Sequence, residues 1–442
     1  MNVSFLQVVL SLLAGIFAIV LLTVRFRIHP FFALLIACFV TGIGVQLPAT
    51  EILNLIKNGF GDVMSKLAVI IVLGTTIGVL LEKNGSTGVM ASAILKLVGQ
   101  KNSSLAISIT GFIVGLPIFC DSGYIVLNGI NKSLVRKTGI AIATMSISLA
   151  SGLYAIHCLI PPHPGATAAA GTIGVDFGKL ISYGILIAIP AMLIGHWWAV
   201  FAGKGTTSGR QESDDTIDHV SEKPKVINAF LPVITPIVLM ALKSFIGMEN
   251  VSASLFTAIL NVVGDPSIAL AIGVGLALLT GKNSKHTLAE KLSTSVEKAG
   301  GILVIIGAGG AFGAVLAATD IGHHFGKNFN LSALGVLFPF LLTSIIKTAQ
   351  GSSTVAIITA SSIVLPLLPT LGLDSGNGKI LAVLSMGAGS MMISHANDAY
   401  FWVISKFSDI DVRTMLKVHS VASLLMGLTT IAVIYILSLI IL

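Results

Sequence analysis

The sequence has few charged residues and few cysteines, and each scarcity excludes a class of protein. Only 10% of its 442 residues are charged and 54% are hydrophobic, with a mean hydropathy of +0.96, so a soluble fold is excluded. Cys38, Cys120 and Cys158 lie in apolar surroundings without paired spacing, which argues against disulfides and a metal site. The net charge of +7 does not indicate a nucleic-acid partner, because the cations stand in short loops, as the positive-inside bias predicts.

Nucleotide-binding signatures are also missing. The glycine-rich run at 307–313, GAGGAFG, departs from the dinucleotide fingerprint because Phe312 occupies the last glycine position. No GxxxxGK[ST] sequence occurs, so ATP-driven transport by this chain alone is unsupported. We therefore expect no cofactor.

Apolar runs recur from end to end of the chain. A helix needs about 20 apolar residues to cross a bilayer, and the shorter runs suit half-helices or hairpin arms. The pattern predicts an all-α polytopic membrane protein with about 12–14 membrane-embedded elements, surrounded by lipid. The amino terminus has no Lys or Arg before its apolar run and no small-residue cleavage site, so we expect the first helix to be retained.

One densely charged segment interrupts the apolar pattern near the middle, at residues 202–225. Its composition is typical of a solvated linker. We therefore predict an N-terminal membrane repeat at 1–201, a cytoplasmic linker at 202–226 and a C-terminal membrane repeat at 227–442.

The two halves resemble each other at an offset of about 235 residues. The matching features, in the same order in both halves, are Gly74 and Gly78 with Gly309 and Gly313, Phe119–Gly123 with Thr348–Ser352, His157 with His395, and Asp176 with Asp411. The glycine pairs have a small-xxx-small spacing, which we interpret as close helix packing rather than as a ligand site.

Charges favour an inverted relation between these repeats. The loop at 25–29 is basic, whereas its counterpart at 247–250 contains one acid and no cation. Lys282, Lys285, Lys291 and Lys298 crowd the segment equivalent to 48–66, which has only Lys57 and Lys66. The cation-rich side therefore changes between the halves, which predicts inverted topology.

Polar residues interrupt the apolar pattern most clearly at 345–360, IIKTAQGSSTVAIITA. Lys347, Gln350, Gly351 and the hydroxyls Ser352, Ser353 and Thr354 stand between two apolar segments. Such groups are costly in hydrocarbon unless they face protein or a water-filled cavity. The segment predicts the tip of a re-entrant hairpin; an ordinary loop at the membrane surface is the alternative.

Three further polar clusters follow the same logic. At 115–128, Pro117 and Gly123 predict an unwound turn that carries Asp121 and Ser122. At 157–171, three prolines around His163 cannot continue a helix, and at 395–402 His395, Asn397 and Asp398 follow a small-residue run. Paired breaks in corresponding positions of two repeats indicate a transporter site at the repeat interface.

Several of these residues have a second interpretation. His157 and His395 are either site residues or buried structural histidines. Asp121 and Asp398 are candidates for proton coupling if they lie at membrane depth, since burial favours the neutral carboxyl group, but not if they lie in surface loops. Lys347 either offers a cation to an anionic substrate or extends to the membrane interface. His323 and His324 are interpreted as solvated.

Three stretches carry a resemblance to the gluconate permease family of bacterial gluconate:proton symporters. They are HCLIPPHPG at 157–165, TAQGSSTVA at 348–356 and SHANDAYFW at 394–402, and the likeness extends over essentially the whole chain. The resemblance implies proton-coupled uptake of sugar acids or related small carboxylates at the bacterial inner membrane. It also implies two inverted repeats with paired re-entrant hairpins, which in similar proteins often move like an elevator.

One departure affects the substrate. Gluconate permeases tend to carry a Phe-Phe-Glu-Val-Gly-Phe type of sequence at the first hairpin, whereas this chain has FCDSGY at 119–124. A shorter acid and an added hydroxyl make glycerate as credible as gluconate, and D-serine is a further possible substrate. A homodimer is expected from analogy alone.

The resulting hypothesis is a symporter with no catalytic residues. Its predicted substrate-binding residues are Ser122, Gly123, His157, Gln350, Gly351, Ser352, Ser353, Thr354 and Asn397, and its predicted proton-coupling residues are Asp121, Asp398 and His395. A channel would need a continuous polar path rather than paired breaks. An intramembrane enzyme that pairs a serine with His157 or His395 is the other alternative.

Overall fold

The described residues of the chain fold into helices, most of them joined by short connections. The computed structural model describes residues 4–98, 102–204, 224–246, 255–280, 287–320, 333–395 and 398–442. The helices of the first half are α1 Phe5–Val24, α2 Pro30–Gly44, α3 Ala49–Lys83, α4 Ser86–Val98, α5 Ser103–Val114, α6 Cys120–Thr138, α7 Ile142–Leu159, α8 Pro164–Ile173 and α9 Phe177–Gly203. Those of the second half are α10 Val226–Ile246, α11 Leu255–Val263, α12 Pro266–Leu279, α13 Leu288–Ala318, α15 Leu337–Gln350, α16 Ser353–Val364, η3 Leu365–Leu367, α17 Gly376–Met391, α18 Ala399–Ser408, α19 Val412–Met415, η4 Leu416–Ser420 and α20 Val421–Ile441.

The lengths and compositions of these helices are those of a polytopic membrane protein. Within the described residues, seven helical stretches could cross a bilayer, and the pair α11 and α12, bent by 71°, could form an eighth span or a re-entrant loop. Four shorter apolar helices accompany them. In the most apolar 18 residues of the stretch formed by α7 and α8, 94% is buried, against 28% for α1, so α7 and α8 lie at the centre of the molecule.

The order of the helices repeats in the two halves. An offset of 235 residues carries α8 onto α18 and brings the start of α9 onto the start of α19. Asp176 and Asp411 begin these equivalent helices, and each accepts a hydrogen bond from the backbone N–H three residues later. The match between the two aspartates is therefore confirmed at the level of helix capping.

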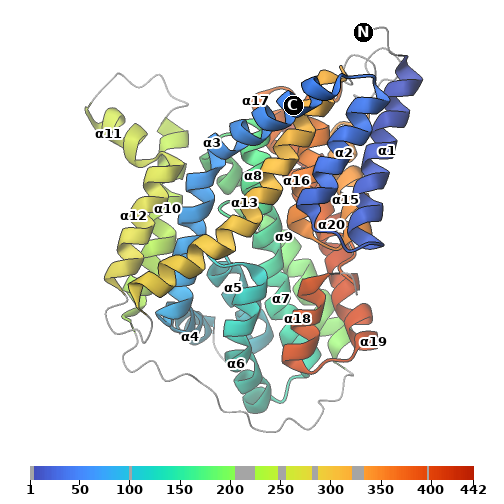
Figure 1. The fold of residues 1–442 in the computed structure, drawn as a ribbon. Helices are drawn as coiled ribbons and strands as arrows, with labels where there is room; N and C mark the ends of the chain where they lie inside the picture. Colours follow the sequence, from blue (N-terminus) through green and yellow to red (C-terminus); the bar gives the residue numbers. More distant parts are fainter. Residues whose placement is uncertain are drawn as a thin grey trace.

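The two longest helices, α3 and α13, pack against each other through the middle of the molecule and run antiparallel (Figure 1). Near the start of α3, Gly59 packs against Gly310 in the second half of α13. Near the end of α3, Glu82 Oε2 lies 3.5 Å from Lys298 Nζ, in the first half of α13. Equivalent helices that run in opposite directions are what an inverted repeat requires.

The outer helices follow the same pattern. The pair α1 and α2 packs on α13, and the pair α10 and α12 packs on α3, so each half covers the long helix of the other. Figure 1 shows the two pairs on opposite sides of the molecule. Most of the linker at 202–226 lies outside the described residues, as do His323 and His324, so the domain boundaries stay a prediction.

Four breaks interrupt the helices, two in each half. Residues 115–119 separate α5 from α6, and 160–163 separate α7 from α8. In the second half, α15 ends at Gly351, whose φ of +88° suits glycine, and α16 begins directly after Ser352. The fourth break lies between the end of α17 at Met391 and the start of α18 at Ala399. Gly123 lies inside α6, so its assignment to the unwound turn is wrong; the turn precedes it, where Pro117 prevents a regular helix.

Candidate functional site

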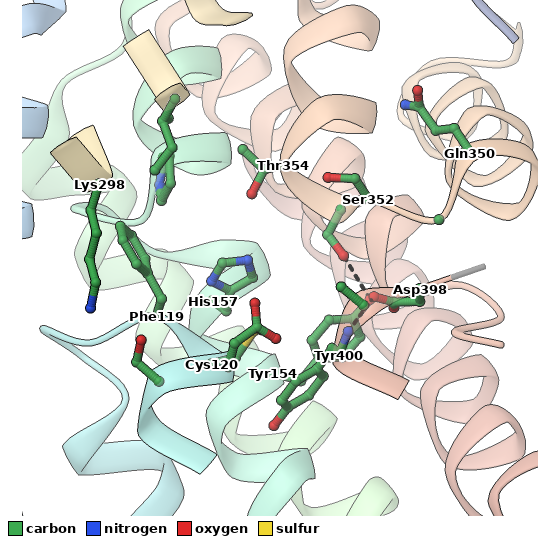
Figure 2. Close-up of a pocket in the computed structure, with 17 residues that line it drawn as sticks. Phe119, Cys120, Tyr154, His157, Lys298, Gln350, Ser352, Thr354, Asp398 and Tyr400 are labelled. Atoms are coloured by element: carbon green, nitrogen blue, oxygen red, sulfur yellow. Dashed lines mark hydrogen bonds between the residues drawn. The ribbon is translucent and has the colours of Figure 1, made fainter. Parts of the chain in front are cut away.

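The four breaks surround one cavity of about 440 Å³. Its wall combines the starts of three half-helices, the tip between α15 and α16, and side chains from α7 and α13. The lining residues are Phe119, Cys120, Asp121, Ser122, Tyr154, His157, Pro164, Lys298, Ile302, Gln350, Gly351, Ser352, Ser353, Thr354, Asp398, Ala399 and Tyr400. Figure 2 shows Lys298 on one side of the cavity, Ser352 and Thr354 on the other, and His157 between them.

The amino-terminal ends of four helices line the cavity, and these helices are α6, α8, α16 and α18. Ser352 caps α16 and Asp398 caps α18 through their side-chain oxygens. The residues before the other two helices, Phe119 and His163, make no side-chain capping bond. Helix N-termini carry positive partial charge and exposed N–H groups, so this arrangement favours an anion.

Most of the residues predicted for the site do line this cavity. They are Asp121, Ser122, His157, Gln350, Gly351, Ser352, Ser353, Thr354 and Asp398. Gly123 is outside the lining and packs against Leu153, and His395 is also outside it, with Nε2 3.1 Å from the carbonyl oxygen of Thr348. Asn397 lies outside the described residues.

Two tyrosines that the sequence did not single out shape one wall. The Tyr154 hydroxyl lies 2.7 Å from Ser353 Oγ, and Tyr154 donates to the carbonyl oxygen of Ser390 at 3.0 Å. The ring of Tyr400 stacks on Tyr154 with 5.5 Å between centroids. Ser353 is therefore held in place and 7% exposed, whereas Ser352 and Thr354 are partly exposed to the cavity.

Asp398 is a paired carboxylate. Its Oδ2 lies 2.8 Å from Lys347 Nζ and accepts a hydrogen bond from Ser394 Oγ, while Oδ1 accepts from the N–H of Tyr400 at 2.9 Å. The Lys347 side chain is fully buried. Lys347 does not line the cavity, so the cavity wall separates its ammonium group from a substrate. Because the side chain is fully buried, the prediction that it extends to the membrane interface is wrong.

Asp121 has a different environment at the start of α6. Its side chain is partly exposed to the cavity, and within the described part of the chain no cation lies within ion-pair distance of it. Among those residues, its side chain accepts one weak hydrogen bond, from Cys120 Sγ at 3.9 Å. Of the two predicted coupling carboxylates, Asp121 is therefore the unpaired one.

Hydrogen bonds of two histidines determine which ring nitrogen of His157 carries the proton. His163 Nε2 lies 2.8 Å from the Gly115 carbonyl oxygen, so this nitrogen carries hydrogen. In a neutral ring, the other nitrogen of His163, Nδ1, must then accept a hydrogen bond. Nδ1 of His157, 3.3 Å away, donates that bond. Nε2 of a neutral His157 is left as an acceptor, which suits a hydroxyl donor in the cavity.

Lys298 is the cation that the sequence reasoning missed at this site. In the sequence it is one of four lysines on the cation-rich side of the second half, whereas in the structure it is part of α13 and lines the cavity. Its partner is Glu82 on α3, and both side chains are partly exposed, at 35% and 24%. A hydrated ion pair of this kind is weak, so an anion can compete for Lys298.

Comparisons with known proteins agree with this geometry. Residues 7–440 match a family model described as GntP family permease. The chain is 31% identical to a gluconate permease of Pseudomonas aeruginosa, over 98% of this chain and 97% of that protein. It is 29% identical to the D-serine transporter DsdX of Escherichia coli, over 99% of this chain and 100% of that protein.

A solved structure shows a similar fold. The YdaH transporter of Alcanivorax borkumensis, whose topology is described as unusual, superposes with a TM-score of 0.63 over 88% of this chain and 89% of that chain. At 15% sequence identity, this likeness concerns the fold alone.

Proposed function

The chain belongs to the GntP family of permeases, and from this premise we propose that it is a proton-coupled symporter importing gluconate or a related small hydroxycarboxylate such as glycerate. Membership of a transporter family rules out the intramembrane-enzyme alternative. It also makes the chain a multi-pass protein of the plasma membrane. The identity of the substrate and the coupling of its uptake to protons are the parts of the proposal that need experiments.

The observation that carries the proposal is the convergence of four helix N-termini on one cavity. Two of them, α6 and α8, have no side-chain cap, and α6 begins with Cys120, Asp121 and Ser122 at the cavity wall. A substrate carboxylate at the start of α6 replaces the missing cap and accepts from the backbone N–H groups of that helix. A volume of about 440 Å³ lies within the range of roughly 300–1,000 Å³ that is usual for small-molecule sites.

The remaining polar groups suit a hydroxylated substrate. Ser122, Ser352 and Thr354 present hydroxyls that donate or accept, and His157 presents Nε2 as an acceptor. Substrate hydroxyls donate to His157 and bond to Ser352 and Thr354. Lys298 lies on the opposite side of the cavity and adds a positive charge, for which the substrate carboxylate competes with Glu82.

Charge transfer favours symport over uniport. Moving one negative charge inward against a potential of 100 mV costs about 2.3 kcal/mol, which one co-transported proton cancels and two reverse. Asp121 is the proposed proton carrier because Asp398 is already neutralised by Lys347. Protonation of Asp121 also removes a negative charge from the helix terminus at which the anionic substrate binds.

The test is uptake of radiolabelled gluconate into proteoliposomes, with and without an inward proton gradient. Unlabelled glycerate, other sugar acids and D-serine serve as competitors. We expect gradient-stimulated uptake of unchanged label, with the hydroxycarboxylates as the strongest competitors. If D-serine alone competes, the substrate is D-serine, as in the name of DsdX, rather than a hydroxycarboxylate. Uptake at the same rate with and without the gradient would contradict proton coupling.

A further inference from the structure

The ammonium group of Lys347 lies behind the cavity wall, between two broken helices. Lys347 is in the last turn of α15, and its side chain is 0% exposed. Nζ donates to the Gly351 carbonyl oxygen at 2.7 Å and to Asp398 Oδ2 at 2.8 Å. Asp398 separates this ammonium from the cavity, so Lys347 connects the hairpin tip to the start of α18.

This is a position where a dissolved cation would be stable. The C-terminus of α15 carries negative partial charge, and the left-handed backbone of Gly351 ends the helix there. Asp398 adds a carboxylate, and Ser394 holds that carboxylate by a hydrogen bond. In secondary transporters with broken helices, unwound carbonyls and half-helix C-termini are the groups that coordinate coupling cations.

The two repeats explain why the second half needs a cation here. At the offset of 235 residues, Asp398 is the equivalent of His163, and both precede the second half-helix of a broken pair. In the first half, His163 Nε2 donates directly to the Gly115 carbonyl at the end of α5. A carboxylate cannot donate to a carbonyl, so a hydrogen-bond donor or a cation must stand between Asp398 and Gly351, and the Lys347 ammonium is both.

We propose that the pocket formed by Gly351, Asp398 and Ser394 is a monovalent-cation site that the chain fills with its own Lys347 ammonium. The tethered cation joins the hairpin tip to α18, so the site needs no dissolved ion. Removal of the lysine side chain exposes a site for Na⁺. The proposal rests on the proposed function only for its uptake readout, whereas its melting readout is independent of transport.

The first experiment uses the full-length Lys347→Ala variant in detergent and in proteoliposomes. Chlorides of sodium, lithium, potassium and ammonium are compared with choline chloride at equal ionic strength. We expect Na⁺ to raise the melting temperature of Lys347→Ala by roughly 2–4 °C, as binding to the folded state requires, and to leave the wild type unchanged. Gluconate uptake by the variant should fall at least tenfold in choline and recover partly in sodium.

A matched control is the Lys291→Ala variant. Lys291 is also a buried lysine, 6% exposed, but its Nζ bonds to the neutral amide oxygen of Asn84 at 2.8 Å. Its removal exposes no carboxylate, so no cation-specific shift is expected. An equal sodium shift in both variants, or no shift in Lys347→Ala with any of the cations, would overturn the proposal.

A second variant covers the case in which Lys347→Ala does not fold. Removal of one partner of a buried pair leaves an uncompensated charge, whereas replacing both partners is often neutral. We expect Lys347→Met with Asp398→Asn to insert and fold, to show no sodium-dependent melting, and to transport at least tenfold more slowly in every salt. Wild-type uptake by this double variant would show that no cation is needed at the site. If wild-type protein fails to import gluconate, the proposed function fails while the melting comparison remains decisive.

Discussion

Three charged groups line the cavity, and their partners give them different roles. Asp398 is held by Lys347, Ser394 and the N–H of Tyr400, so its charge is balanced before any substrate arrives. Lys298 is only loosely paired with Glu82, in a partly exposed position. Asp121 has no ion-pair partner among the described residues and stands at an uncapped helix start. A proton can therefore bind Asp121 without breaking an existing pair.

The first prediction concerns this carboxyl group. Asp121→Asn keeps the size and polarity of the side chain but cannot exchange a proton. Gradient-driven accumulation of labelled gluconate should fall at least tenfold, and the pH dependence of uptake should flatten. Exchange of internal for external gluconate at equal pH should persist, because it needs no net proton movement. The measurement compares gradient-driven uptake with exchange in the same proteoliposomes.

Asp176→Asn is the control for this substitution. Asp176 caps α9 from an exposed position, and asparagine caps a helix about as well as aspartate, so both assays should resemble the wild type. Undiminished accumulation by Asp121→Asn would exclude Asp121 as the proton carrier. Loss of exchange together with accumulation would assign Asp121 to substrate binding instead.

At the scale of elements, the long helix α3 contacts the broken segments through its glycines. A Cβ atom at Gly78 would lie 2.5 Å from the Pro117 carbonyl oxygen, and one at Gly74 would lie 2.8 Å from Pro162 Cβ. The close packing predicted from the small-xxx-small spacing is confirmed, and its partners are the two breaks of the first half. The shape of these two breaks thus depends on the absence of side chains at Gly74 and Gly78 of α3.

The second prediction tests this dependence with a pair of glycines on one helix. Gly78→Ala forces the backbone at Pro117 to move, because a carbonyl oxygen cannot yield as a flexible side chain does. Overpacking of this kind typically costs about 1–3 kcal/mol, and uptake should fall at least fivefold. Gly61→Ala, where no atom lies within 4 Å of the added Cβ, should transport normally. Initial rates per inserted protein and melting temperatures are measured for both; equal behaviour would contradict the packing argument.

The breaks and the repeat offset could be predicted from the sequence, but the side chains that meet at the cavity could be predicted only in part. Pro117, the prolines beside His163 and the polar run at Gly351 each disrupt a helix locally, so they are visible in the sequence. Tyr154 gives no such signal, because it lies within an apolar helix and reaches the site only through packing. Lys298 belongs to α13, which is distant from the polar clusters in the sequence. The side of α13 that faces the cavity depends on how this helix packs against α3.

At the scale of the whole molecule, the inverted relation of the halves was predicted from charge counts, and the helix contacts supply a stronger basis. Of the four lysines that suggested it, Lys291 is buried in α13 and Lys298 lines the cavity, while Lys282 and Lys285 lie outside the described residues. Charge counts treat all such lysines as loop cations, although a helix can bury some of them. The antiparallel course of α3 and α13 depends on specific contacts between Gly59 and Gly310 and between Glu82 and Lys298.

This architecture places the cavity between α13 and the broken helices. Lys298 and Ile302 come from α13, whereas most of the wall comes from half-helices and their breaks. If the broken helices carry the substrate past a fixed pair of long helices, α16 must slide along α13. The two helices touch where a Cβ atom on Gly309 would contact the side chain of Ile358.

The third prediction follows from this sliding. Gly309→Cys combined with Ile358→Cys links α13 to α16 when oxidised. A Cβ atom on Gly309 would contact the side chain of Ile358, so the two cysteines are close enough for a disulfide. We expect uptake by the oxidised variant to fall at least tenfold and to return on reduction, with cross-linking followed by thiol labelling. The native cysteines remain in place, because all three are buried, and the wild type is labelled in parallel because Cys120 lines the cavity.

The control variants carry one cysteine each, Gly309→Cys or Ile358→Cys, and are oxidised in the same way. Neither can form the link between α13 and α16, so oxidation should leave the uptake of each unchanged. This comparison separates a block of motion from damage by oxidation and from the effect of each substitution alone. Full uptake with the α13–α16 link formed would show that the hairpin does not slide past α13, and the motion would then have to lie within the broken helices.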